Sequence, residues 1–287
     1  MSATLSPARS TAPRPRATRL PGAARLAGVR AGVELRQFWR ERDSVVFIFA
    51  YPVLMLAIFS TVFGSEEQGA DGVSIDYAQY FLPGMIATGI MLTSFQTLAI
   101  SIAMERDDGT LRRLRATPLP ATSYFFGKVL LTLATLIPQT ALLLVVAAVA
   151  FDVPMPSDPG RWFTFAWVFV LGTACGAVCG VGFSSLPRSG RSANAIVTPV
   201  VLVLQFVSGV FFAFFALPGW MQSVASVFPL KWIAQGMRSV FLPDDLVALE
   251  PSGSWQHVAT AAVLAAWLLI GLVVGARTFR WRRRDDG

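Results

Sequence analysis

Side chains that commonly act as nucleophiles, bases or metal ligands are scarce in this sequence of 287 residues. The only histidine, His257, lies two residues after Trp255 at the start of an apolar run, a position typical of a membrane interface. Cys175 and Cys179 are four residues apart, which would strain a disulfide and gives a metal only two ligands. The sequence has neither a Gly-x-Ser-x-Gly elbow nor a Gly-x4-Gly-Lys-[Ser/Thr] phosphate loop. We therefore expect no enzyme activity, no metal and no cofactor in this chain.

One charged segment, residues 105–118, lies between two apolar runs that are each long enough to cross a bilayer. Asp107 and Asp108 lie where a short helix would begin, and three arginines lie toward its end, which matches the helix dipole: Arg112, Arg113 and Arg115. Local features follow in turn: a sharp turn at Gly109, a cap at Thr110, an apolar ridge at Leu111 and Leu114, and helix-ending prolines at Pro118 and Pro120. A merely basic loop would explain the arginines but not the paired acids. We therefore predict a short rigid helix at the inner face of the membrane, which another protein can contact and displace.

The elements that would position this segment are six apolar runs. Hydrophobic residues make up 54% of the chain and charged residues 14%, whereas a soluble domain has about 25% charged residues. A helix needs about 20 apolar residues to cross the hydrocarbon core, so we predict an all-α integral membrane protein. The predicted spans are 44–64, 82–104, 124–151, 162–184, 194–216 and 258–278. Lys128, near the start of the third span, is expected to snorkel to the interface.

The distribution of basic residues predicts the orientation in the membrane. With the N-terminus in the cytoplasm, 21 of the 24 Lys and Arg residues fall on the inner side, and the exceptions are Arg161, Lys231 and Arg238. Both termini are therefore predicted to be cytoplasmic. The basic excess is a topology signal, so no nucleic-acid partner is expected. The abundance of Ala and Arg suggests a bacterial source and hence the bacterial plasma membrane.

The segments that flank the spans have distinct compositions. Residues 1–23 combine arginines with Ser, Thr, Pro and Ala and predict a disordered cytoplasmic tail. Residues 24–43 show helical periodicity and predict an amphipathic helix along the inner leaflet, anchored by Phe38 and Trp39. Residues 279–287 predict a basic cytoplasmic tail.

Three stripes of neutral polar residues lie inside the predicted spans at helical spacing. They are Ser94, Thr97 and Ser101; Thr132, Thr135 and Gln139; and Asn194, Thr198, Gln205 and Ser208. Such stripes either line a translocation pathway or form hydrogen bonds with neighbouring helices. No Asp, Glu or Arg lies deep in a span, where a proton- or sodium-coupled carrier normally needs one. The energy for any transport is therefore expected to come from elsewhere.

Glycines recur at every fourth residue in two of the spans. The fourth span has Gly172, Gly176 and Gly180, and the last has Gly271 and Gly275. This spacing lets another helix approach to backbone contact. The partner is either a helix of the same chain, which we favour, or a helix that slides or belongs to a second copy.

Several motifs give the chain a family resemblance that covers nearly everything after residue 24. The first comprises Glu105-Arg106, Gly109-Thr110-Leu111, Leu114 and Thr117-Pro118. Others are Tyr80-Phe-Leu-Pro-Gly84, Phe206-Val-Ser-Gly209, Leu217-Pro218-Gly-Trp220, Phe228-Pro229-Leu230 and Gly236-Met-Arg238. With these motifs the chain resembles the membrane subunit of ABC-2 type transporters, in particular permeases similar to daunorubicin and doxorubicin resistance exporters.

The resemblance implies a fold, partners and site residues. It makes 105–118 a cytoplasmic coupling helix and 217–242 an extracellular re-entrant helical hairpin. It implies an ATP-binding-cassette ATPase subunit that binds ATP and Mg, and two membrane halves per transporter, for which we favour a homodimer with a second permease copy over two related chains. It also implies export from the cytoplasm, and we expect a hydrophobic or amphipathic small molecule taken from the cytoplasm or inner leaflet. The coupling residues would be Glu105, Arg106, Gly109, Thr110, Leu111, Arg112, Leu114 and Pro118. Pathway or gate residues would be Ser94, Thr97, Asn194, Thr198, Gln205, Phe206, Ser208, Phe211 and Phe212.

Two other functions remain open at this point. The same architecture could export a polysaccharide on a lipid carrier, which a wide aromatic-lined groove would favour. A membrane scaffold or membrane enzyme would instead act without an ATPase partner.

Overall fold

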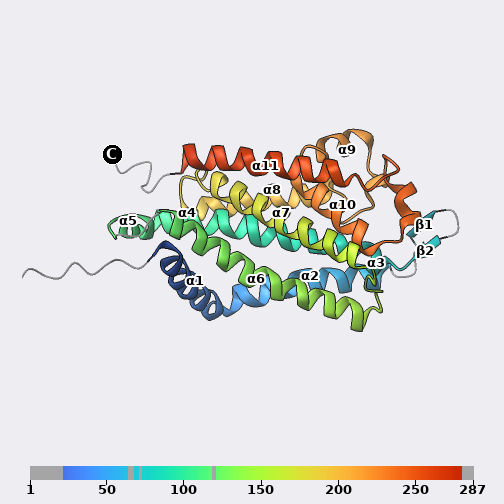
Figure 1. Ribbon diagram of the computed structural model, residues 1–287, viewed down its shortest axis with the longest axis horizontal. Helices are drawn as coiled ribbons and strands as arrows, with labels where there is room; N and C mark the ends of the chain where they lie inside the picture. The colour runs from blue at the N-terminus through green and yellow to red at the C-terminus, as the bar shows by residue number, and fades with distance from the viewer. Residues whose placement is uncertain (1–21, 64–67, 71–72, 118–120, 280–287) are drawn as a thin grey trace, which may run out of the picture.

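The computed structural model describes residues 22–63, 68–70, 73–117 and 121–279. The expected tails 1–23 and 279–287 fall almost wholly outside these residues, as do Pro118 and Pro120. Long helices form an extended bundle, with α1 and α5 at one end and α9, α10 and a β-hairpin at the other (Figure 1). We call these the α5 end and the α10 end.

Six helical segments in the described part of the chain are long and apolar enough to span a membrane. They are α2 (Arg42–Phe63); α3 (Tyr77–Ile90), η1 (Met91–Gln96) and α4 (Thr97–Asp107) in succession; α6 (Ala121–Ala150); α7 (Pro159–Phe183); α8 (Gly190–Val207); and α11 (His257–Thr278). The all-α membrane class is confirmed. One addition is a short antiparallel hairpin, β1 (Gln68–Ala70) paired with β2 (Val73–Ile75).

The second span is longer than its apolar run. It starts at Tyr77, five residues before the predicted start, because the Asp76 carboxylate accepts a hydrogen bond of 2.7 Å from the Ala78 N–H and caps the first turn. Halfway along, η1 is a π-helical turn. Here the Thr97 hydroxyl donates to the Leu92 carbonyl at 3.0 Å. Such turns insert a residue into a helix and rotate the faces on either side of it.

The fifth span is shorter than predicted. Helix α8 ends at Val207 rather than at residue 216, since Gly209 adopts a left-handed φ of 71° and turns the chain back. A Cβ at Gly209 would lie 2.7 Å from the Phe214 side chain, so this turn has room only for glycine. The Gly209 carbonyl accepts a hydrogen bond from the Arg238 guanidinium at 3.2 Å, which holds the turn against α10.

The segment predicted to be re-entrant, 217–242, does form a pair of short helices. After η2 (Phe214–Ala216) come α9 (Gly219–Ala225), α10 (Pro229–Phe241) and η3 (Asp244–Leu249). Every residue of α10 is buried, and the helix packs against α3, α7 and α11. A buried ion pair of 2.9 Å between Arg238 and Glu250 joins α10 to the loop that leads to α11.

The glycine stripes pack within the chain. A Cβ at Gly176 would lie 2.0 Å from the Ser94 hydroxyl, and one at Gly180 would lie 2.8 Å from the Phe95 carbonyl oxygen. The glycine stripe of α7 therefore packs closely against η1 of the second span. A Cβ at Gly271 would lie 3.0 Å from the Cys179 amide, so the stripe of α11 seats α7. These contacts agree with static packing inside one subunit.

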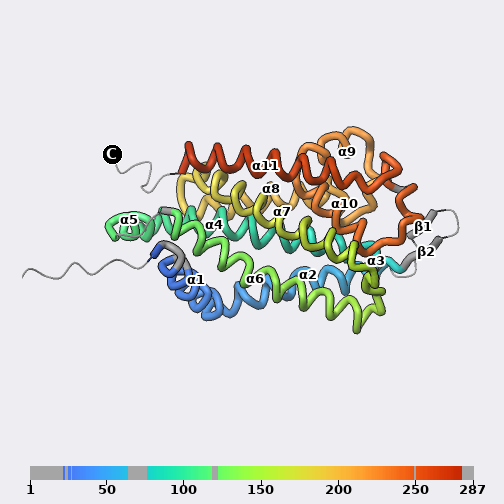
Figure 2. Tube along the Cα trace, viewed as in Figure 1, coloured from blue at the N-terminus to red at the C-terminus, as the bar shows by residue number. Residues whose placement is uncertain are grey.

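Helix α1 (Ala23–Arg40) lies alongside the start of α6 at the α5 end (Figure 2). Its apolar residues Val29 and Val33 are exposed, whereas Glu34 is buried against the bundle. Trp39 is also exposed. Val29 and Val33 thus face away from the protein and Glu34 faces into it. Three basic residues of the helix also stay exposed: Arg25, Arg36 and Arg40. Exposed apolar and basic side chains together suit a helix that lies along a membrane surface.

Candidate coupling site and polar cavity

The charged segment forms a tight turn and a single short helix. Helix α4 ends at Asp107, Gly109 adopts a left-handed φ of 78°, and α5 comprises Thr110–Arg115. The Asp108 carboxylate accepts a hydrogen bond of 2.8 Å from the Thr110 N–H and so caps α5. A Cβ at Gly109 would meet nothing within 4 Å, so only the backbone conformation requires glycine there.

Leu111 fixes α5 to the bundle. Its side chain is fully buried in a small apolar cluster, which we call the Leu111 cluster. The cluster comprises Leu98, Ile102, Leu111, Tyr124 and Ala177. Leu114 and Phe279 pack against its edge. The ridge predicted from Leu111 and Leu114 thus points into the protein, while Arg112 and Arg113 lie on the exposed side of α5.

Two residues of the segment 105–118 bind the start of α8 and the loop before it. The Arg106 guanidinium is buried and donates to the Pro187 carbonyl at 2.9 Å. The Asp107 carboxylate accepts from the Gly190 N–H at 3.2 Å, where its charge also matches the dipole at the N-terminus of α8. Arg106 is therefore placed to position the turn and not to contact a partner. The sequence pattern places Asp107 at the start of the short helix. In the structure it is instead the last residue of α4.

Glu105 also faces inward, into a group of four charged residues that we call the charge cluster. The cluster comprises Arg30 of α1, Glu34 of α1, Glu105 of α4 and Lys128 of α6. Its contacts are Lys128 Nζ to Glu105 at 2.5 Å, Lys128 Nζ to Glu34 at 3.4 Å, Arg30 to Glu34 at 2.7 Å and Arg30 to Glu105 at 3.6 Å. The Tyr124 hydroxyl donates to the second Glu105 oxygen at 2.8 Å. Three helices thus meet in one group of two cations and two anions.

Burial makes the charge cluster sensitive to the loss of any member. The Lys128 side chain is only 3% exposed, so the expectation that it snorkels to the interface is wrong: its ammonium is neutralised inside the protein. Burial raises the pKa of Glu34 above its ordinary value, while Lys128 and Arg30 act in the opposite direction. A buried charge that loses its partner is costly, so the cluster favours one arrangement of α1, α4 and α6.

Two of the predicted polar stripes converge on a cavity of about 140 Å³ next to the charge cluster. Thr97 and Ser101 line it from α4, and Thr132 and Thr135 line it from α6. All four hydroxyls donate to backbone carbonyls of their own helix, which leaves their oxygen lone pairs available to the cavity. Ser94 is not in this cavity, because it packs against Gly176 of α7.

The stripe of the fifth span divides into two parts. Asn194 and Thr198 are exposed on α8, and Thr198 donates to Asn194 at 2.8 Å and accepts from Gln96 at 3.3 Å. Gln205 is buried and accepts from the Tyr51 hydroxyl at 3.4 Å. Ser208 is buried just beyond the end of α8, so it does not share the exposed face.

The predicted gate phenylalanines do lie together at the α10 end of α8. The ring centroids of Phe206 and Phe211 are 5.0 Å apart, and those of Phe206 and Phe212 are 6.2 Å apart. Phe211 is buried and stacks on Phe59 of α2, whereas Phe206 and Phe212 are about half exposed. We call the three residues the Phe cluster.

Comparison with known proteins decides the family. The sequence profile described as ABC-2 type transporter matches residues 31–242, which include α5, α8 and α10. The chain belongs to this family. This ABC-2 family chain is 23% identical to a protein named as a transport permease, ycf38 of Porphyra purpurea, over 84% of its own length and 82% of that protein. It is likewise 23% identical to the inner membrane transport permease YadH of Escherichia coli K12, over 79% and 88%.

A third relative is longer than this ABC-2 family chain. It is named as a multidrug ABC transporter permease, YbhR of Escherichia coli K12, and is 22% identical over 66% of this chain and 50% of that protein. The chain therefore spans about half the length of YbhR.

The sequence pattern missed three of the four residues of the charge cluster. Arg30 and Glu34 fall in the segment 24–43, for which the sequence predicts only an amphipathic helix, and Lys128 is predicted to snorkel to the interface. One signal was present: Lys128 is the single charged residue inside the third apolar run. An isolated charge at the start of a span calls for an acidic partner, and Glu105, at the end of the preceding span, can supply it.

Proposed function

We propose that this ABC-2 family chain is the transmembrane subunit of an exporter that moves a hydrophobic or amphipathic small molecule out of the cytoplasm or inner leaflet. A separate ATP-binding-cassette subunit binds ATP and Mg and supplies the energy. The chain itself is a transport subunit without catalytic residues. It lies in the bacterial plasma membrane with both termini and the α5 end in the cytoplasm, as the excess of basic residues on that side favours.

The charge cluster is the observation that carries this proposal. Helix α5 presents Arg112 and Arg113 outward, where a partner can contact them, and is rooted inward through Leu111. Glu105, one turn before Gly109, is bound to both α1 and α6. A displacement of α5 by the ATPase is therefore transmitted at once to three helices. Thr110, which is the first residue of α5 and is capped by Asp108 instead of capping the helix itself, and Leu114, at the edge of the Leu111 cluster, complete the proposed coupling surface.

A second copy of the chain is proposed to face the exposed polar side of α8. Polar side chains inside a span are unfavourable toward lipid and usually face protein or water. Asn194, Thr198 and Gln96 form such a group on the surface of a single copy. A homodimer that brings two α8 helices together would cover them and place the pathway between the copies.

The proposed class of cargo follows from the side chains of the Phe cluster and of the polar cavity. The exposed rings of Phe206 and Phe212 at the α10 end offer aromatic contacts. The polar cavity offers neutral hydroxyls beside charged side chains, which include Glu34, Glu105 and Lys128, so that an amphipathic molecule finds both apolar and polar partners. In our mechanism, closure of two ATPase subunits moves α5 and α1, the two copies rock, and the Phe cluster opens outward. Transport requires that the cargo bind the two states with different affinity.

The first test is affinity purification of the chain from its native membrane in mild detergent. A stoichiometric subunit with a Gly-x4-Gly-Lys-[Ser/Thr] loop is the expected result, and its absence would overturn the proposal. The second test compares Gly109→Pro with Gly219→Pro in the purified complex, because Pro cannot adopt a φ of 78° whereas Gly219 starts a helix where Pro is tolerated. Gly109→Pro should insert normally and lose cargo-stimulated ATPase activity.

A further inference from the structure

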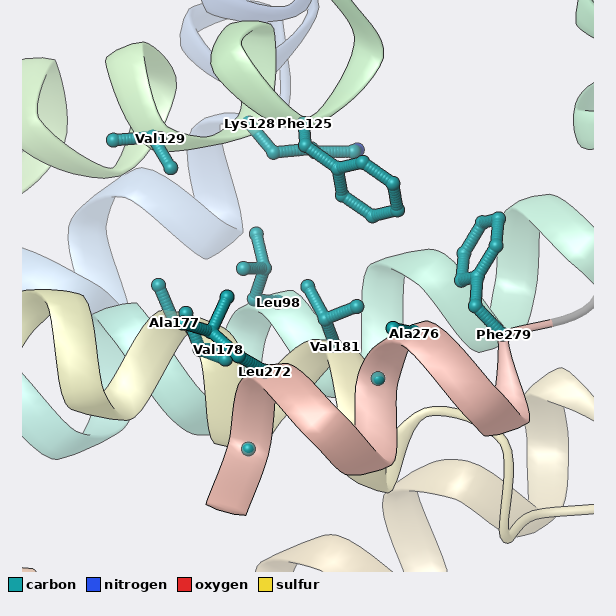
Figure 3. A pocket seen from close by; sticks show the side chains of 12 residues that line it. Leu98, Phe125, Lys128, Val129, Ala177, Val178, Val181, Leu272, Ala276 and Phe279 are labelled. Carbon is teal, nitrogen blue, oxygen red and sulfur yellow. The ribbon is translucent and has the colours of Figure 1, made fainter. Parts of the chain in front are cut away.

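A groove between α6 and α11 lies outside the proposed pathway. Residues of α4 and α7 form its floor, and Figure 3 shows Phe125 of α6 facing Phe279 at one end of it. Its volume is about 440 Å³, within the range of roughly 300–1,000 Å³ that is usual for small-molecule sites. Apart from Lys128, whose ammonium is held by Glu105 and Glu34, the lining side chains are apolar.

Small residues create the groove, and it opens sideways. Gly275 and Ala276 of α11 leave space that larger side chains would fill. At the rim, Val129 of α6 and Leu272 of α11 are exposed and belong to membrane-spanning helices. The groove is therefore open to the hydrocarbon of a bilayer, where an apolar hollow is filled by lipid chains and not by water.

The groove lies in one leaflet, at the α5 end. Its residues on α11 extend from Gly271 to Phe279, a rise of about 12 Å, which is less than half of the roughly 30 Å hydrocarbon core. Phe279 packs on the Leu111 cluster, and Leu98 and Ala177 of that cluster line the groove directly. A molecule that fills the groove therefore contacts the Leu111 cluster, into which α5 packs.

The same end of the bundle is basic. Arg277 is exposed in the last turn of α11. Arg113 and Arg115 are exposed on α5, whose Leu114 packs on the same cluster as Phe279. None of the residues that line the groove is acidic. A negatively charged headgroup at the mouth of the groove would thus meet cations, which attract anionic lipids to a membrane surface.

We propose that the groove binds an acyl chain of an anionic phospholipid from the leaflet at the α5 end, with the phosphate near Arg277 and the exposed arginines of α5. The bound acyl chain completes the packing around Leu98 and Ala177 and thereby stabilises the Leu111 cluster, which holds α5 against the bundle. The proposal rests on the groove alone and holds whatever the cargo or the ATPase partner is.

The test is photolabelling of the purified chain in lipid nanodiscs, without any partner or ATP. The probe is phosphatidylglycerol with a diazirine near the end of one acyl chain, and the labelled residues are located by peptide mass spectrometry. Ala276→Trp fills the groove from an exposed position on its lining, whereas Val273→Trp adds the same bulk at an exposed position outside it. Both changes avoid the buried core, so both variants should fold.

Labelling should concentrate on Val129, Val178 and Leu272 in the wild-type chain and in Val273→Trp. It should fall several-fold in Ala276→Trp, and phosphatidylcholine with the same diazirine should label the groove several-fold less. Equal labelling of the two Trp variants, equal labelling by the two lipids, or labelling spread evenly onto α2 would each overturn the proposal. Disulfide formation between two copies of an Ala276→Cys variant would overturn it as well, because the groove would then be a subunit interface.

Discussion

Replacing Lys128 with Met tests whether the charge cluster holds α1, α4 and α6 together. The ammonium lies 2.5 Å from Glu105 and 3.4 Å from Glu34, and its side chain is 3% exposed. Methionine has a similar length and fills the same space, so the substitution removes a charge and little else. Arg30 would then be the only cation of the cluster left between two carboxylates.

The expected cost follows from burial. Breaking a buried ion pair by removing one partner typically costs about 3–5 kcal/mol. Glu105 is 18% exposed and keeps its hydrogen bond from Tyr124, so we expect the lower limit, about 3 kcal/mol. For a chain of this size that is a decrease in melting temperature of about 5 °C. In the double variant Lys128→Met with Glu105→Gln, one cation faces one anion again, and we expect most of the loss to be recovered.

The measurement is thermal unfolding of the purified chain in one mild detergent at one lipid content. Arg191→Met is the matched control, because it removes a cation from an exposed position at the same end. Its melting temperature should stay within about 1–2 °C of the wild-type value. If Lys128→Met were no more destabilising than Arg191→Met, or if Glu105→Gln added to its effect instead of offsetting it, the cluster would not act as a buried charge-balanced unit.

Three further predictions concern other parts of the bundle. Gly109→Ala should cost about 1–2 kcal/mol through its φ of 78° alone, since a Cβ there meets nothing within 4 Å; a melting temperature unchanged from wild type would contradict the left-handed turn. Gly180→Ala should destabilise far more than Gly275→Ala in the same assay, because its Cβ would lie 2.8 Å from a backbone oxygen, against 3.6 Å from a side chain; equal effects would mean that α7 and η1 are not in contact. Glu34 has a raised pKa when folded, so the wild-type chain should lose stability as pH rises from the ordinary value of 4.5 through the folded pKa. Glu34→Gln should lack that part of the loss, and identical pH profiles of melting temperature would refute the assignment.

The six spans could be found from the sequence because their signal is local. A run of about 20 apolar residues needs no knowledge of its neighbours to be recognised as a membrane helix. The same holds for the turn at Gly109 and the ridge at Leu111, where turn chemistry and helical spacing are written into adjacent residues. The end of α8 was misjudged because residues 208–216 are as apolar as a span. Only the contact between Gly209 and Arg238 shows that the chain turns back there.

The side-chain roles within the coupling motif depended on the fold. Glu105 and Arg106 stand beside a predicted partner surface, and apart from the isolated charge of Lys128, which calls for an acidic partner, the sequence gives no reason to turn them inward. In the structure Glu105 faces inward because Lys128 and Arg30 need an acidic partner. Arg106 faces inward because it donates a hydrogen bond to the Pro187 carbonyl. The polar stripes behaved in the same way: the spacing put Thr97 and Thr132 on helix faces, but the packing of α4 against α6 decided that those faces meet.

By itself, then, the sequence determined the membrane class, the approximate positions of the spans and the turn at Gly109, because hydropathy, charge asymmetry and glycine conformation act within a few residues. Tertiary structure alone decided which polar groups pair, where the polar cavity lies, and that small residues on α11 leave a groove toward α6. Those features arise between residues that lie from 23 positions apart, as Glu105 and Lys128 do, to 173 positions apart, as Leu98 and Gly271 do. Their geometry depends on how the helices pack, which periodicity along one helix cannot specify.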